Sequence, residues 1–253
     1  IFSVDIKIDD DNGGQGIQSF DITVPFPPKT YVPDDNFEAY LEANSMGDGI
    51  PNNDSVITAN ISSVSFLDLY NGGNGHNIYD LTGIADFASL TVLNCDNNQI
   101  GTLDLTANNG LTSISCANNQ ISTFTITDVT ALDQLTCQNN QILELNIAGA
   151  PIANLDISNN PLNNLNLSNC ANLTGALDVS NSNGHNLSVL DVTGCTGLTS
   201  LSCSNNTLTA LDLTGLENIE SLVCSNNQIT SLDINGFTNL TALEFDSSQV
   251  DVE

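Results

Sequence analysis

The stretch LTVLNCDNNQI, residues 90–100, decides the architecture of this chain. Apolar residues or cysteine stand at its first, fourth, sixth and eleventh positions, and asparagine stands at its ninth. The same spacing returns at 111–121, 132–142, 152–162, 198–208 and 219–229, and a degenerate copy runs over 240–250. Consecutive units, including an irregular one at 173–197, start 20 to 25 residues apart. A pattern repeated at a nearly fixed period predicts similar units stacked in one direction.

The spacing is that of the leucine-rich repeat, L-x-x-L-x-[LC]-x-x-[NC]-x-L. Each unit supplies a short first strand whose apolar side chains point into a common core, and neighbouring units must stack because one unit cannot bury its own apolar face. Apolar–polar–apolar triplets predict a second short strand in each unit, at 103–105, 124–126, 145–147, 165–167, 190–192, 211–213 and 232–234. We therefore expect a mostly β leucine-rich repeat solenoid of ~21-residue repeats.

The asparagine at the ninth position sits where the chain turns off the first strand. Its amide can satisfy backbone groups in its own turn and in the next one. We expect a structural ladder made of Asn98, Asn119, Asn140, Asn160, Asn206 and Asn227.

The ends of the solenoid are predicted from two further patterns. The long loop in the unit at 173–197 resembles an earlier segment at 67–78, and both contain Asn-Gly-His-Asn. The solenoid is therefore predicted to begin near Ile61 or Val64 and to span 61–253. Residues 29–60 are predicted to form an N-terminal cap with a short helix, which has Asp or Asn within 34–36 as N-cap and is ended by Gly47-Asp48-Gly49.

Residues 1–28 alternate apolar and polar residues on both sides of the turn cluster at 9–14, and a Pro-rich linker follows. The pattern predicts a β-hairpin. Because a lone hairpin is barely stable, we interpret it as the terminal hairpin of a β-sandwich-like domain that belongs to a longer, multidomain chain.

The charge excludes several classes of partner. The chain has 30 Asp and Glu against 2 Lys and Arg, a formal charge of −28, and its only cationic residues are Lys7 and Lys29. Nucleic-acid binding needs cations that displace counterions from phosphate, and an anionic membrane needs a basic patch. We expect no nucleic acid partner, no direct membrane insertion and an acidic protein that works outside the cell.

Four segments carry a family resemblance: YVPDDNFE at 31–38, DGIPNND at 48–54, TANI at 58–61 and DLTGI at 80–84. Together with the repeats, they resemble secreted or cell-surface leucine-rich repeat proteins of Bacteroidota, of the flavobacterial type, over about 31–250. The hairpin resembles the tail of a cadherin-like or Ig-like repeat. The resemblance implies export, often by type IX secretion, location outside the cell or on its outer surface, and recognition or adhesion without catalysis. Ser55, in Asp54-Ser55-Val56, matches the O-glycosylation pattern of such bacteria; the alternative is an ordinary acidic loop.

Cysteine and histidine are interpreted as structural residues. Five cysteines occupy the inward sixth position of the repeat, where they act as small apolar residues: Cys95, Cys116, Cys137, Cys203 and Cys224. Cys170 and Cys195 share a turn position that is apolar elsewhere, and a disulfide between them stays an alternative. His76 and His185 are interpreted as polar loop residues. With no nucleophile, base and oxyanion set, we expect no catalytic residues and no enzyme.

Acidic clusters raise the question of calcium, which binds several carboxylate and carbonyl oxygens. Asp9, Asp10 and Asp11 resemble a calcium-dependent cadherin linker, and Asp48 and Asp54 bracket a second cluster. The second strands place Asp191, Asp212 and Asp233 in consecutive units, with Asp104 at the same position earlier. The alternative for all of them is a solvated acidic surface.

The exposed positions of the first strands are small and polar, and we predict a ligand face there: Asn94, Ser115, Thr136, Asp156, Ser202 and Glu244. Because the chain has no Trp or Arg, which dominate tight protein interfaces, we expect weak, repeated contacts with a protein or glycan on a surface. The hypothesis is a non-catalytic extracellular recognition or adhesion module. The alternatives are a structural spacer in a long adhesin or extracellular filament, and a calcium-binding adhesin segment.

Overall fold

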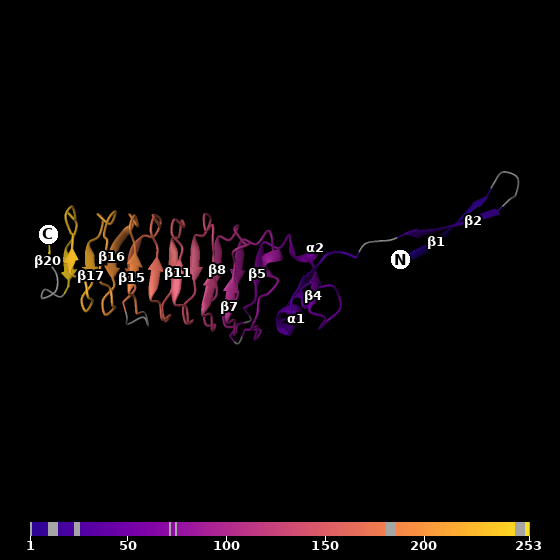
Figure 1. The fold of residues 1–253 in the computed structure, drawn as a ribbon, viewed down its shortest axis with the longest axis horizontal. Coiled ribbons are helices and arrows are strands. Elements are labelled where there is room, and N and C mark those ends of the chain that lie inside the picture. Colours follow the sequence, from indigo (N-terminus) through magenta and orange to yellow (C-terminus); the bar gives the residue numbers. More distant parts are fainter. Residues whose placement is uncertain are drawn as a thin grey trace.

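The computed structural model describes residues 2–9, 15–22, 26–70, 72–73, 75–180, 186–245 and 251–252. Figure 1 shows an elongated coil whose short strands stack along one axis from β5 to the C-terminal end, with α1 and β4 beside its N-terminal end. This architecture confirms the predicted mostly β solenoid with a short helix near the N-terminus.

The elements before the solenoid are two antiparallel strand pairs and two helices: β1 (Phe2–Asp9), β2 (Gln15–Ile22), β3 (Lys29–Tyr31), α1 (Asp35–Ala43), β4 (Ser55–Ile57) and α2 (Thr58–Ile61). β1 and β2 form the predicted hairpin.

The first strands of the turns build what we call the first-strand face. They are β5 (Phe66–Asp68), β6 (Val92–Asn94), β8 (Ser113–Ser115), β10 (Gln134–Thr136), β12 (Asn154–Asp156), β14 (Gly175–Asp178), β16 (Leu198–Ser202), β17 (Ser221–Val223) and β19 (Ala242–Glu244). They form two parallel sheets, β5-β6-β8-β10-β12 and β14-β16-β17-β19.

The second strands build the opposite, second-strand face. They are β7 (Thr102–Asp104), β9 (Thr123–Thr125), β11 (Glu144–Asn146), β13 (Asn164–Asn166), β15 (Val189–Asp191), β18 (Ser231–Leu232) and β20 (Asp251–Val252). The short 3₁₀ helix η1 (Ile84–Asp86) lies in the first turn. The triplet at 211–213 was predicted as a strand and, in the described part of the chain, is not one. A groove of about 420 Å³ lies there, lined by residues of 210–214 and 231–237.

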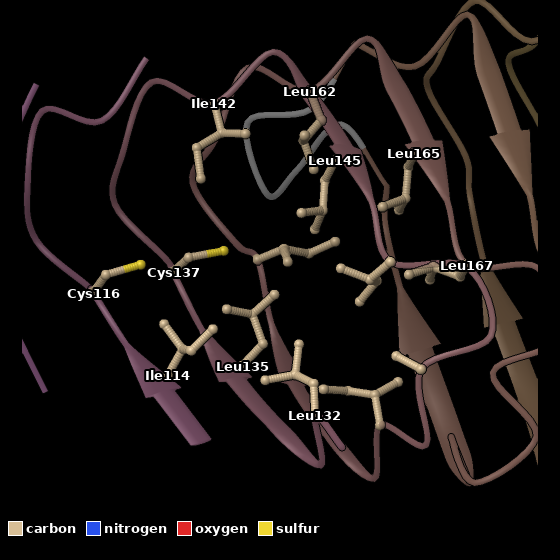
Figure 2. Close-up of a cluster of buried hydrophobic side chains, with 14 of the residues drawn as sticks. Ile114, Cys116, Leu132, Leu135, Cys137, Ile142, Leu145, Leu162, Leu165 and Leu167 are labelled. Atoms are coloured by element: carbon tan, nitrogen blue, oxygen red, sulfur yellow. The ribbon is translucent and has the colours of Figure 1, made fainter. Parts of the chain in front are cut away.

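One core runs between the two faces. Equivalent leucines stand in exact register from turn to turn; Leu93 faces Ile114, which in turn faces Leu135. Figure 2 shows Ile114 and Leu135 pointing into the interior of the coil from one side, and Leu145 and Leu165 pointing into it from the other. All five are at most 3% exposed. Since burying each such side chain contributes about 1.5–3 kcal/mol, the stacking of turns supplies most of the stability.

The asparagines at the ninth repeat position close each bend; five of the six are buried, and Asn119 is half-buried. Asn140 donates from Nδ2 to the carbonyl oxygens of Cys116 and Cys137, both at 2.9 Å, and its Oδ1 accepts the Ile121 amide at 3.0 Å. Each amide thus satisfies backbone groups of two consecutive turns. The same contacts to the previous turn and to the residue's own turn are made by Asn98, Asn119, Asn160, Asn206 and Asn227.

A second, exposed asparagine ladder lies beside the buried one, and the sequence reasoning missed it. The residue before each buried asparagine adopts a left-handed backbone with φ of 54–58°, which asparagine tolerates better than most residues. Three pairs of these side chains bond between neighbouring turns: Asn139 Nδ2 lies 2.7 Å from Asn118 Oδ1, Asn159 Nδ2 lies 2.8 Å from Asn139 Oδ1, and Asn226 Nδ2 lies 3.0 Å from Asn205 Oδ1. The repeated Asn-Asn pair was the available signal.

All seven cysteines lie among the described residues, are buried and form no disulfide, which confirms the core interpretation. The disulfide alternative for Cys170 and Cys195 is therefore wrong: their thiols donate to backbone carbonyls of Ile147 and Leu167 in the preceding turns. Burial raises the pKa of Cys195 to about 11 and that of Cys203 to about 12.

The cap is tied to the solenoid through the start of its helix. Asp34 is the N-cap: its Oδ1 accepts the amides of Asn36 and Phe37, and its Oδ2 accepts the amides of Tyr79 and Asp80 in the first turn. The Phe37 ring stacks on Phe87 at 6.3 Å. The helix ends at Ala43, before the glycine that the sequence predicted to end it, because Asn44 caps it by bonding to Tyr40.

Replacing Asn140 with Ala should lower the free energy of unfolding by about 3 kcal/mol, because two carbonyls and one amide lose buried partners. Urea denaturation measures the loss. Gln141→Ala, at the exposed neighbouring position, should change stability by less than about 0.5 kcal/mol. Equal effects of the two variants would contradict a structural role for the buried ladder.

The thiols should be inert in the native protein, because burial and raised pKa values leave little thiolate. A maleimide at pH 8 should label few cysteines before unfolding, and all seven once urea has unfolded the chain. Rapid native labelling of even one of them, counted by mass spectrometry, would show that its turn opens readily.

Candidate recognition surface

The first-strand face displays a polar column. The last residues of β6, β8, β10 and β12, namely Asn94, Ser115, Thr136 and Asp156, stand in register across one parallel sheet. The other two predicted residues, Ser202 and Glu244, lie in the second sheet, where Val223 separates them. The structure thus brings four of the six predicted residues together and places two elsewhere.

The polar column is held by its own hydrogen bonds. The Ser115 hydroxyl lies 2.8 Å from both carboxylate oxygens of Asp96 and 2.8 Å from the Thr136 hydroxyl. Asp96 also accepts the amide of Ala117 at 2.6 Å. Sequence reasoning missed Asp96 because it stands just beyond the strand, where no repeat position marks it. These contacts fix the rotamers that a ligand would meet.

The column continues to the cap through β5, which sequence reasoning did not include. Asp68 pairs with Asn94, and Phe66 precedes it on the same strand with 60% exposure. Beside them, the ring of Tyr40 on α1 meets that of His76 edge to face at 5.0 Å. Burial, and then the charge of Asp68, raise the pKa of Tyr40. His76 is therefore in contact with an aromatic ring, while His185 lies outside the described residues.

Of the predicted metal ligands, the structure describes the side chains of Asp48 and Asp54. Asp48 forms an ion pair with Lys29 at 2.6 Å and accepts bonds from Asn53. The Lys29 ammonium, together with Asn53, lowers the pKa of Asp48 to about 2. Asp9 ends β1, and Asp10 and Asp11 lie outside the described residues.

Asp54 groups with Asp35 and Glu38: one carboxylate oxygen from each lies within 4.8 Å of the other two. Glu38 is 1% exposed, and its oxygens accept the amides of Asn53 at 3.0 Å and Asp54 at 3.2 Å. These bonds account for the buried carboxylate as a brace of the cap loop.

The acidic column of the second strands has a local role. Asp104, Asp191, Asp212 and Asp233 each accept the backbone amide of the residue two positions later. Hydrogen bonds from the side chain and then the backbone amide of Thr214 lower the pKa of Asp212, and bonds from the backbone amide and then the side chain of Thr106 lower that of Asp104. The carboxylates therefore shape the turns that follow the second strands.

Ser55, the predicted glycosylation site, is in β4 and half-buried. Its hydroxyl donates to Asn53 Oδ1 at 2.9 Å and accepts from the Lys29 ammonium at 3.2 Å. A glycan on this oxygen would have to displace at least the first bond.

None of the helices in the described part of the chain has the length and apolar character that a membrane crossing requires. No protein-family model matches the chain, and no curated protein matches it.

Solved structures do resemble it. The functional domain of InlJ from Listeria monocytogenes, which includes a cysteine ladder, superposes with a TM-score of 0.52 at 24% identity, over 88% of this chain and 63% of that one. The chain thus spans less than two thirds of that domain. The internalin InlF from L. monocytogenes str. 4b F2365 gives 0.44 at 16% identity, over 88% and 78%. YopM, a leucine-rich effector of Yersinia pestis, gives 0.43 at 20%, over 68% and 52%. The likeness to InlJ shows the leucine-rich repeat fold.

The Lys29–Asp48 pair should make the cap sensitive to acid. Because the folded pKa of Asp48 is lowered to about 2, its stabilising contribution is complete above the ordinary carboxyl pKa, near 4, and is lost as pH falls toward 2. The difference in melting temperature between wild type and Asp48→Asn should therefore shrink between pH 5 and pH 2. Asp133→Asn, at an exposed position far from Lys29 in sequence, serves as control. A difference that stays constant with pH would contradict the ion pair.

Proposed function

We propose that this chain is a non-catalytic recognition module that acts outside the cell or on its outer surface, and that its ligand binds across the first-strand face. One observation carries the proposal: Asn94, Ser115, Thr136 and Asp156 stand in one register on a continuous parallel sheet. Strand spacing repeats these groups about every 4.8 Å. A ligand with a repeated or extended backbone can therefore meet one polar group from each turn.

The surface is arranged in advance of binding. Asp96 and Thr136 hold the Ser115 hydroxyl from two sides, so little side-chain entropy is lost when a partner contacts it. The exposed groups are small hydroxyls, amides and carboxylates. They support hydrogen-bonded contact with a protein or a glycan, at modest strength per turn.

Location outside the cell is supported by the acidic surface and by the resemblance of the cap and repeats to secreted leucine-rich repeat proteins of Bacteroidota. The InlJ domain shares the fold and supports a bacterial protein of this architecture.

The stacked core and the two asparagine ladders also favour a second candidate, a structural spacer in a long adhesin or filament. Neither ladder needs a ligand to be useful, since both join neighbouring turns of the chain itself. A spacer depends on its core and is indifferent to its exposed polar side chains.

Replacement of the polar column separates the two candidates. Beads coated with the purified chain are tested on intact bacterial surfaces, host-cell surfaces and printed glycans. The double variant Thr136→Ala with Asp156→Asn should bind the positive surface about tenfold more weakly, the effect of about 1.4 kcal/mol.

The matched control is Thr125→Ala in β9, an exposed threonine on the second-strand face, which should bind like wild type. Circular dichroism confirms that each variant is folded. Unchanged binding by the double variant, or no binding by the wild type to any of these surfaces, would overturn recognition by this face and favour the spacer.

A further inference from the structure

The N-terminal end of the first-strand face carries the exposed aromatic residues that the polar column lacks. We call Tyr40, Phe66, Asp68, Tyr70 and His76 the junction patch, because they lie where the cap meets the first turn. Phe66 and Tyr70 are 60% and 40% exposed.

Phe66, Asp68 and Tyr70 point to one side of the chain, since the residues between them, Leu67 and Leu69, are buried in the core. Tyr40 joins them from α1: the charge of Asp68 acts on its hydroxyl, and its ring lies against His76. One oxygen of Asp68 accepts the Tyr70 amide at 3.2 Å, which restrains a carboxylate whose neighbours on the same side of the chain are Phe66 and Tyr70. Aromatic rings beside a carboxylate can bind a flat, positively charged group.

The chain itself contains no arginine, the residue whose side chain is such a group. No Lys or Arg follows residue 29, and Lys29 is paired with Asp48. A chain with a formal charge of −28 attracts cationic partners over long range. Charge complementarity therefore selects a basic ligand for this patch.

Granted the recognition role proposed above, we infer that the junction patch binds an arginine side chain of a basic peptide segment in the partner. A guanidinium stacks on the faces of Phe66 or Tyr70. Its N–H groups donate to the carboxylate of Asp68. Arginine fits better than lysine because its flat, weakly hydrated head uses the ring and the carboxylate together.

The register of the parallel sheet also predicts where a second basic residue of the partner peptide would bind. Asp68 and Asp156 stand at the two ends of the polar column, four strand steps apart. At about 4.8 Å a step this is roughly 19 Å, which an extended peptide covers with about six residues. The segment should therefore carry two basic residues about six positions apart, one at each carboxylate.

Tyrosine fluorescence provides a local signal for the test. The chain has no Trp, and its four tyrosines all lie between residues 31 and 79. The probe is a peptide with two arginines about six residues apart, and the control peptide carries the neutral isostere citrulline at both places. The arginine peptide should change the tyrosine emission with a saturable dependence on concentration, and the citrulline peptide should not.

Two variants locate the contact. Asp68→Asn and the double variant Phe66→Ala with Tyr70→Ala should each weaken binding about tenfold, in line with a charge-assisted bond and a cation–π contact of about 1–2 kcal/mol each. Asp212→Asn, on the second-strand face, removes the same unit of charge far from the patch and should change affinity less than twofold. Calorimetry repeats the affinities where loss of Tyr70 reduces the emission.

If Asp212→Asn and Asp68→Asn weaken binding of the arginine peptide equally, the peptide responds only to the net charge of the chain, and the inference is overturned. Full affinity of the aromatic double variant, or equal binding of the citrulline peptide, would overturn it as well. If the arginine peptide does not bind, but Thr136→Ala with Asp156→Asn still weakens surface binding, the arginine site is overturned and the recognition role is retained. If both fail, the recognition role itself is overturned.

Discussion

The fold rests on one constraint: no turn of this chain can bury its own apolar face. Each leucine in a turn needs the equivalent residues of its neighbours, and the register of Leu93, Ile114 and Leu135 shows how the chain meets that need. Each bend leaves backbone carbonyl and amide groups away from water, and the asparagine side chains supply the hydrogen bonds that these groups need. Asn140 bonds to groups in two turns. Apolar packing and polar satisfaction are therefore both relations between turns.

Repetition made much of this predictable. A position that recurs every ~21 residues shows its environment many times, so the inward cysteines and asparagines could be recognised without coordinates. The strand predicted at 211–213 is absent although its pattern is identical to the others, so the pattern alone does not decide whether a ladder forms. The helix end at Ala43 was missed because Asn44 competed with a glycine as the stop signal.

The recognition surface was predicted less well than the core. Thr136 and Asp156 were placed correctly in one column, but nothing in the repeat indicated that the two sheets part after β12 and leave Ser202 and Glu244 elsewhere. Contacts between non-equivalent positions were also invisible. Asp96 accepts a bond from Ser115 of the following turn, and the charge of Asp68 acts on Tyr40 in a helix outside the repeats. Such pairs depend on three-dimensional placement that periodicity does not encode.

The uniform register has a consequence for how such a protein changes length over evolution. Between β6 and β10 every interface joins the same positions of two successive turns. Duplication or loss of a whole unit there recreates interfaces that already exist, so the chain can grow or shrink without a new core having to be found. The 25-residue unit before Leu198 lacks this interchangeability, because its longer loop matches neither neighbour. Changes in the length of the solenoid are therefore expected to occur on one side of that unit, and by whole turns.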